Sequence, residues 1–324
     1  MKKRIIILGS VVLAVVVAWS VAWYVLAGLV RQNIEALAQS DGVSEPRVTC
    51  DTLNVGGFPF RFDLDCGNAQ VVSGDIVVDV AAVRASMLVY SPTHAVASLQ
   101  GPAKLTDSFT GSRNDLDWSS LEASVNLNSW RIGRVSVSGK DVVWSDALFG
   151  NAVIARSALV EGHLFDIPEQ HDPARGTAAI AGYLRMVDGA WPALTLNDSN
   201  AEVQVELSGL PDDVRNWGDA SLLLPQMQAN GAKLKIVAIR ATDGDATLDA
   251  SGELALDAEH RPEGQVTITS HGVEQRIGPV LGEPWRSLVL GTPTQDGGHT
   301  NLISLRAGAV FVGLVPVATL TPLF

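Results

Sequence analysis

The chain has 324 residues, of which 47% are hydrophobic, and it carries 23 lysines and arginines against 35 aspartates and glutamates. This length allows one large or two ordinary domains, and the composition supplies enough apolar side chains for a sizeable core. The net charge of −12 repels phosphate backbones, which argues against nucleic acid as a partner.

The N-terminus predicts a membrane anchor. Residues 1–4 form a basic cytoplasmic tail, and residues 5–30 are uncharged and mostly apolar. About 20 apolar residues cross a bilayer, so residues 5–30 are expected to form a transmembrane helix. The basic tail favours the cytoplasmic side, which predicts a single-pass bacterial inner-membrane protein with most of the chain in the periplasm.

A cleaved signal peptide is the alternative interpretation of this segment. Ser20-Val21-Ala22 offers a small-x-small cleavage site, but it lies inside the apolar run. The apolar core of a signal peptide is usually about 7–15 residues long, and the run here is longer. The length therefore favours an uncleaved anchor, followed by a juxtamembrane helical stalk over residues 31–44.

Residues 45–324 are expected to form a periplasmic β-rich domain. Many short segments alternate apolar and polar residues, and helices do not alternate with them. The expected fold is mainly β: a transmembrane helix followed by a long, curved antiparallel sheet with two short helices, at 211–231 and 273–291. Residues 310–324 are expected to form a buried final strand.

The stretch "LNVGGFPFRFDLDC" interrupts the alternation at residues 53–66. Gly56 and Gly57 allow the backbone to turn, and Pro59 fixes one dihedral angle. Phe58 and Phe60 are expected to pack under the turn. These five residues predict a structural corner in a sheet rather than a loop that contacts a ligand.

Two cysteines, Cys50 and Cys66, flank this corner in strand-like segments. An exported domain retains disulfides, so a bond across two neighbouring strands is expected. Such a loop contributes about 3 kcal/mol in the chain-entropy model.

Two motifs resemble the DUF2125 family of alphaproteobacterial membrane-anchored proteins. They are "L-x-V-x-GFPFRFDL" near residues 53–64 and a final "G-x-VF-x-G-x-VP" strand close to "PLF". The resemblance brings no established activity, so its motif residues receive no catalytic role: Gly57, Phe58, Pro59, Arg61 and Asp63. More distantly, the layout is similar to AsmA-like envelope proteins, in which an inner-membrane anchor carries a curved β-sheet that handles lipid. Such likeness concerns the fold and does not establish a function.

Few residues in the sequence indicate a metal, phosphate or catalytic site. His163, Asp166, Glu169, His171 and Asp172 are metal-capable side chains in one segment, but their spacing fits no standard site. The glycines of residues 133–141 miss the phosphate-loop spacing, and no GxSxG or HExxH occurs. A Ser-His-Asp triad needs no proximity in sequence, so it stays open. We expect no enzyme activity, no metal site and no cofactor.

Three functional hypotheses follow. The favoured one is non-catalytic binding or transfer of lipid or another apolar envelope component along the sheet. The alternative is a scaffold that docks an envelope protein through its sheet, and a hydrolase with a scattered triad is the least favoured. A long one-sided sheet must cover its apolar face, and an uncovered face would mark a lipid or partner site.

Overall fold

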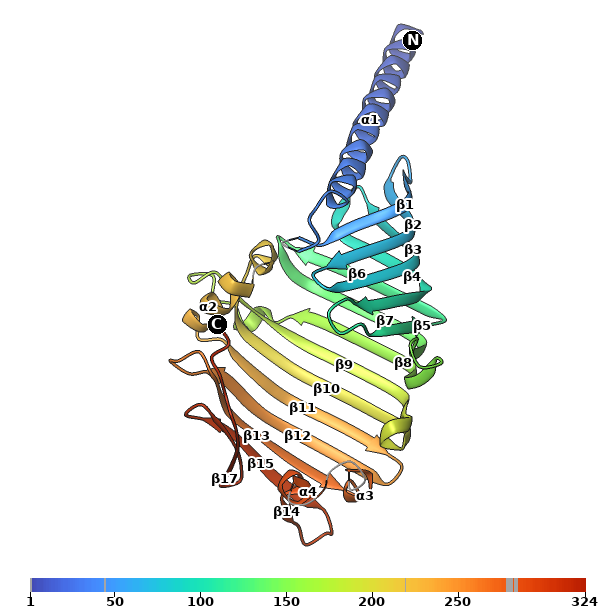
Figure 1. Cartoon of the computed structure of the whole chain (residues 1–324). Helices are drawn as coiled ribbons and strands as arrows, with labels where there is room; N and C mark the ends of the chain where they lie inside the picture. Colours follow the sequence, from blue (N-terminus) through green and yellow to red (C-terminus); the bar gives the residue numbers. More distant parts are fainter. Residues whose placement is uncertain (1, 44, 219, 278–281, 283–284) are drawn as a thin grey trace. The chain divides into compact units, whose positions relative to one another are not determined.

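The computed structural model describes residues 2–43, 45–218, 220–277, 282 and 285–324. Two compact units make up the chain, which Figure 1 shows coloured along the sequence. Unit 1 contains Met1–Ser124 and Ser145–Ala152, and unit 2 contains Val125–Trp144 and Val153–Phe324. Each unit is described by itself. The boundaries predicted at residues 4, 30 and 44 stay predictions.

Unit 1 begins with one long helix, α1 (Lys2–Leu37). Its segment Lys3–Leu37 is long and apolar enough to cross a membrane, with a mean hydropathy of 2.7 in its most apolar window. The stalk predicted beyond residue 30 is helical to Leu37 and belongs to the same helix. The Ser40 hydroxyl donates to the Leu37 carbonyl at 2.8 Å, so a side chain satisfies one carbonyl at the helix end.

Antiparallel strands form the rest of unit 1. They are β1 (Arg47–Gly56), β2 (Arg61–Ser73), β3 (Ile76–Leu88), β4 (Ser91–Asp107) and β5 (Arg113–Asp117), while β6 (Ser120–Asn128) and β7 (Arg131–Asp146) have residues in both units. Each of β1 to β4 pairs with the next strand along the chain. This meander is the antiparallel arrangement that the alternating pattern predicts.

The alternation in β2 places its charges and its apolar residues on opposite faces. Phe62 and Leu64 lie opposite Met87 and Ala85 of β3. On the other face, the Asp65 carboxylate lies 3.5 Å from Arg84 Nε. Because side chains alternate along a strand, one register gives β2 an apolar face and a charged face.

Unit 2 contains the longer run of antiparallel strands (Figure 1, green to red). They are β8 (Ala152–Asp166), β9 (Thr177–Trp191), β10 (Leu196–Pro211), β11 (Lys233–Asp243), β12 (Ala246–Leu256), β13 (Pro262–His271), β14 (Thr292–Pro293), β15 (His299–Arg306), β16 (Ala309–Val312) and β17 (Val315–Thr319). Strands β8 to β13 pair in chain order, β13 pairs with β15, and β15 to β17 pair in order. The predicted fold class, mainly β with an antiparallel sheet after a long apolar helix, is confirmed.

Short helices fill the connections of unit 2. The helix predicted at 211–231 is found as η3 (Val214–Trp217) and α2 (Ala220–Ala229). The prediction at 273–291 corresponds to α3 (Glu274–Ile277) and α4 (Trp285–Leu290), and residues 278–281 and 283–284 lie outside the described part. Two further turns, η1 (Pro168–Gln170) and η2 (Pro192–Leu194), begin with proline, whose fixed φ suits a first helical position.

The prediction of a buried final strand is wrong. Residues 309–319 form the two-stranded hairpin β16–β17, and its side chains are partly or fully exposed. Leu314 at the turn is 88% exposed, and Val315 is 47% exposed. Apolar composition indicates that a segment gains from burial, but it does not supply the second layer that would bury it.

Candidate functional site

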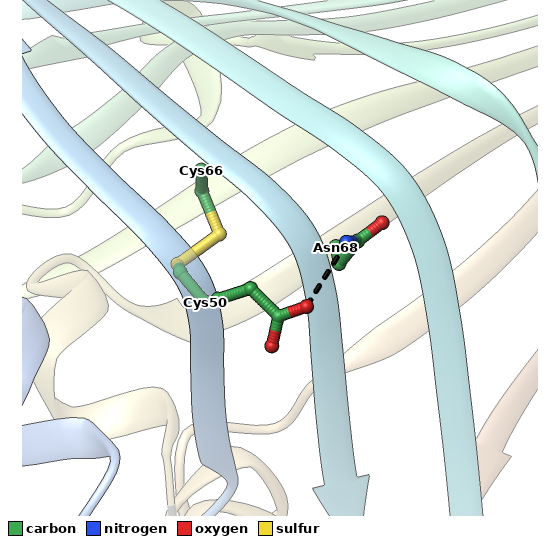
Figure 2. The surroundings of a disulfide bond; sticks show 4 residues. Cys50, Cys66 and Asn68 are labelled. Carbon is green, nitrogen blue, oxygen red and sulfur yellow. Dashed lines mark hydrogen bonds between the residues drawn. A yellow bond between two sulfur atoms is a disulfide. The ribbon is translucent and has the colours of Figure 1, made fainter.

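Cys50 and Cys66 form a disulfide that joins β1 to β2 (Figure 2). The two sulfur atoms lie 2.01 Å apart, and the Cα atoms 5.3 Å apart. Beside it, Asn68 has a positive φ of 47°, and its side-chain amide donates to the Asp51 carboxylate at 2.9 Å. The disulfide therefore cross-links the first hairpin, and this polar contact supports the backbone where β2 departs from regular strand geometry.

The predicted corner is the β1–β2 connection. Gly57 has a φ of 97°, and a Cβ atom built there would lie 2.8 Å from the Arg61 carbonyl oxygen. The Arg61 amide donates to the Gly57 carbonyl at 2.9 Å, which closes the turn. The Phe58–Pro59 peptide bond is cis. Only glycine fits this combination of positive φ and close backbone approach.

Phe58 and Phe60, which were expected to pack under the turn, have ring partners outside it. They lie against aromatic rings of α1: Phe58 stacks on Tyr24 with ring centroids 5.9 Å apart, and Phe60 lies 6.4 Å from Trp19. Trp23 is only 4% exposed and stacks on Phe62 at 5.6 Å. The corner therefore docks the first hairpin onto α1, a contact that local sequence patterns do not reveal.

We expect Gly57→Ala to destabilise unit 1 by about 1–3 kcal/mol, because alanine combines an unfavourable positive φ with a clash against Arg61. Gly56→Ala is the matched control, since a Cβ atom there meets nothing within 4 Å. Its effect should stay within about 0.5 kcal/mol. Thermal denaturation of both full-length variants in one detergent checks this. Equal shifts would contradict the role assigned to Gly57.

The structure distributes the metal-capable residues over separate contacts. His171 Nε2 lies 2.6 Å from the Asp166 carboxylate, and its Nδ1 lies 3.3 Å from an Arg131 guanidinium nitrogen. His163 Nδ1 lies 2.9 Å from the Ser136 hydroxyl. Among the described residues, no group of three or more His, Cys, Asp or Glu side chains is placed to hold a metal ion. The serine and the carboxylate thus contact two different histidines, and the absence of catalysis stays a prediction.

The largest organised feature of unit 2 is an apolar row that crosses its strands. Eight strands, β8 to β13, β15 and β16, contribute one residue each, and each residue is directly paired with the next. The row consists of Leu164, Gly182, Val205, Ile236, Gly252, Val266, Ile303 and Val312. Because paired residues lie on the same side of a sheet, these eight residues share one face.

Further rows extend this face on both sides. One is Ile180, Leu207, Leu234 and Leu254; the other is Leu184, Val203, Ile239, Ala250 and Ile268. Together with the central row they are called the apolar face below. Every central-row residue is half-buried, whereas in the flanking rows Ala250 is 8% exposed and Leu184 is 48% exposed. A complete second layer would bury such residues, so the described part of the chain covers this face only in part.

The opposite side of the same strands is charged. Glu206, Lys235 and Glu253 are directly paired across β10, β11 and β12. Lys235 Nζ lies 3.2 Å from the Glu206 carboxylate. A hydrogen bond to Glu253 raises the pKa of Lys233 on this side. These charges suit water, so the charged side of the sheet is the side that faces solvent. The incomplete covering of the apolar face therefore needs a separate explanation.

One end of the apolar face deepens into a cavity of about 320 Å³. Met186, Ala201, Ala241 and Leu248 form a fourth paired row at its base, and Trp191, Leu194 and Val273 also line it. Its lining is almost entirely apolar, and its volume is in the range of small-molecule pockets. The cavity therefore continues the apolar face and is called the end cavity below.

Ser199, Asp243 and Arg276 are among the polar residues at the end cavity. Ser199 Oγ is buried without a hydrogen-bond partner among the described residues. Asp243 Oδ2 is also buried and lies 3.2 Å from Arg276 Nε, an ion pair without a hydrogen bond. Buried polar atoms are normally satisfied, so these two atoms are exceptions to that rule within the part of the chain that the structure describes.

The sequence analysis missed this site. Asp243 ends β11, Ser199 lies in β10 and Arg276 lies in α3, and no local motif joins them. The one available signal was the sustained alternation of β9 to β13, which predicts an apolar face but not its register. The end cavity forms only when those strands are aligned.

Comparison with known proteins supplies the family. No curated protein and no solved structure matches the chain. A family described as "Uncharacterized protein conserved in bacteria (DUF2125)" matches residues 23–321. This range includes Trp23, the corner, the disulfide and every strand of the apolar face. The chain therefore belongs to the DUF2125 family.

Proposed function

We propose that the protein is anchored in a bacterial inner membrane by α1 and that unit 2 binds lipid or another apolar envelope component. The partly covered apolar face is the observation that carries this proposal. An acyl chain lying along the rows would complete that covering. The charged opposite face suits water, so the two sides of the sheet differ as a binding role requires.

The size of the apolar face supports an acyl-chain ligand. Eight strands about 4.8 Å apart span about 34 Å, and three rows two residues apart span about 13 Å. The resulting area, on the order of 450 Å², lies in the range of the largest apolar patch of a typical monomer, about 300–600 Å², and such patches are often functional. The face is therefore long and narrow. Long apolar chains therefore fit the face better than a compact ligand.

The charged side chains beside the end cavity bear on the charge of this ligand. Asp243 Oδ2 lies 3.2 Å from Arg276 Nε. A free fatty acid would place its carboxylate beside Asp243, which is unfavourable despite Arg276. An uncharged apolar group therefore suits the end cavity better.

Two features support the proposed orientation of the protein in the membrane. Lys2, Lys3 and Arg4 precede the apolar run and favour the cytoplasmic side, so the strands would be periplasmic. The Cys50–Cys66 disulfide fits that oxidising compartment.

Docking of an envelope protein through the sheet is the alternative. Among the strand pairings of the described residues, β17 has β16 as its neighbour, so its other side offers backbone groups for an added strand. Pro316 lies within β17 and reduces this capacity, since proline donates no backbone hydrogen bond. The apolar face itself could bury a protein helix, so the experiment must separate lipid from protein.

Photocrosslinking in vesicles tests the proposal. The full-length protein is placed in phospholipid vesicles whose acyl chains carry a diazirine, irradiated, and digested for mass spectrometry. Adducts are expected on α1 and on apolar-face residues of β9 to β13. Adducts confined to α1 would remove lipid binding by unit 2 and leave the protein-docking alternative.

A further inference from the structure

The β1–β2 corner presents an exposed aromatic rim next to α1. Phe58 is 46% exposed, Phe60 59% and Tyr90 75%, and Trp19 and Tyr24 of α1 are 41% and 65% exposed. Tyr90 belongs to the β3–β4 turn, where the Val89 amide donates to the Phe60 carbonyl at 3.0 Å. The five rings, from three segments, are called the aromatic rim below.

Two indole hydrogen bonds fix the corner against α1. Trp19 Nε1 donates to the Pro59 carbonyl at 3.0 Å, and Trp23 Nε1 donates to the Arg61 carbonyl at 2.9 Å. Because these residues lie one helical turn apart, the corner is held along the helix at a defined level. Wherever Trp19 and Trp23 lie relative to a bilayer, Phe58 and Phe60 lie at nearly the same depth.

The backbone of the corner is prepared for a poorly hydrated environment. The carbonyls of Gly57, Pro59, Phe60 and Arg61 all accept hydrogen bonds from groups of unit 1. Pro59 has no N–H to satisfy. Irregular backbone near lipid is costly unless its polar groups are paired within the protein. These four carbonyls meet that requirement.

The charged residues beside the corner limit how far α1 enters the hydrocarbon core of the bilayer. Arg61 and Asp63 lie next to the corner, 2.9 Å apart, and are partly exposed to the surroundings. If all of residues 5–30 lay in hydrocarbon, this charged pair would enter it with Trp23, at a cost of about 2.5–3.5 kcal/mol per charge on insertion scales. Residues 5–22 span about 27 Å as a helix, which already matches the roughly 30 Å core. The hydrocarbon boundary is therefore best placed near Ala22.

We propose that the aromatic rim lies in the lipid–water interface of the membrane that α1 crosses, so that unit 1 contacts the bilayer with its corner as well as its helix. The occupant is the headgroup region of the bilayer, where Trp and Tyr rings are favoured. The proposal rests on the anchoring by α1 in the proposed function. It shortens the hydrocarbon span from residues 5–30 to residues 5–22.

Nitroxide accessibility in vesicles tests the depth. Single cysteines are introduced as Phe60→Cys, Tyr90→Cys, Leu13→Cys and Phe109→Cys in the full-length protein, labelled without reductant to keep the native disulfide. The vesicles contain phosphatidylethanolamine and phosphatidylglycerol. Collisions with a water-soluble nickel reagent and with oxygen are measured at each site. Leu13 is 65% exposed in α1, and Phe109 is 85% exposed in the β4–β5 turn, at the other end of the same strands.

We expect the nickel collision rate at positions 60 and 90 to be severalfold below that at position 109, with oxygen collisions between those at 109 and 13. Positions 60 and 90 as accessible to nickel as 109, with 13 protected, would overturn the rim proposal and leave the anchor intact. A nickel-accessible position 13 would overturn both, because α1 would not cross the membrane. The two failures are therefore distinguishable.

Discussion

Leu184→Glu is expected to lower the yield of acyl-chain crosslinks in unit 2 by at least about tenfold, whereas Leu302→Glu should leave it unchanged. A carboxylate facing hydrocarbon costs about 2.5–3.5 kcal/mol on insertion scales, and each 1.4 kcal/mol weakens binding about tenfold. Leu184 lies on the apolar face, directly paired with Val203. Leu302 is paired with Thr267 on the opposite side of the sheet.

The two leucines make a matched pair. Leu184 is 48% exposed and Leu302 is 42% exposed, and both lie within strands. Their cost to folding should therefore be similar, which comparison of melting temperatures checks. Adducts on α1 serve as the internal standard for incorporation into vesicles. Equal crosslinking of unit 2 in both variants would place the ligand elsewhere than on the apolar face.

Trp23→Ala is expected to weaken the contact between α1 and the first hairpin by about 3–5 kcal/mol, the usual cost of removing a buried aromatic side chain. Trp23 is 4% exposed, contacts the rings of Phe58 and Phe62, and donates to the Arg61 carbonyl. Hydrogen exchange of the β1 and β2 amides in the full-length protein measures the loss as a lower free energy of opening.

Tyr24→Ala is the control for this prediction. Tyr24 is the next residue of the helix and stacks on Phe58, but it is 65% exposed. Its replacement should change the same opening free energy by less than about 1 kcal/mol, as expected for a residue near the surface. If both variants opened equally, Trp23 would not be the residue that docks the corner.

These predictions all concern what the exposed apolar surface of this protein contacts. In unit 1, the exposed rings gather beside a helix that is itself apolar enough for a membrane. In unit 2, half-buried apolar residues line up across eight strands, and the face that they form continues into an apolar cavity. Surface exposed in organised patches indicates a ligand or an interface rather than incomplete packing.

Several properties of this protein were determined by its sequence alone. The uncharged run after three basic residues predicts a long apolar helix, since composition is enough to decide which solvent a helix prefers. The alternation after residue 45 predicts antiparallel strands, because the period of two is a local property of the backbone. Two cysteines flanking one turn predict the disulfide between Cys50 and Cys66, and the glycines and proline predict the turn itself.

Other properties were decided only by the tertiary structure. The ring partners of Phe58 and Phe60 are residues of α1 far away in the sequence, so no local pattern specifies them. The apolar face depends on the register of eight strands, and a slip of one residue would turn each strand's apolar set to the other side. The β16–β17 hairpin was predicted to be buried because its residues are apolar, yet burial requires a second layer, and only the packing of distant segments determines where a layer exists.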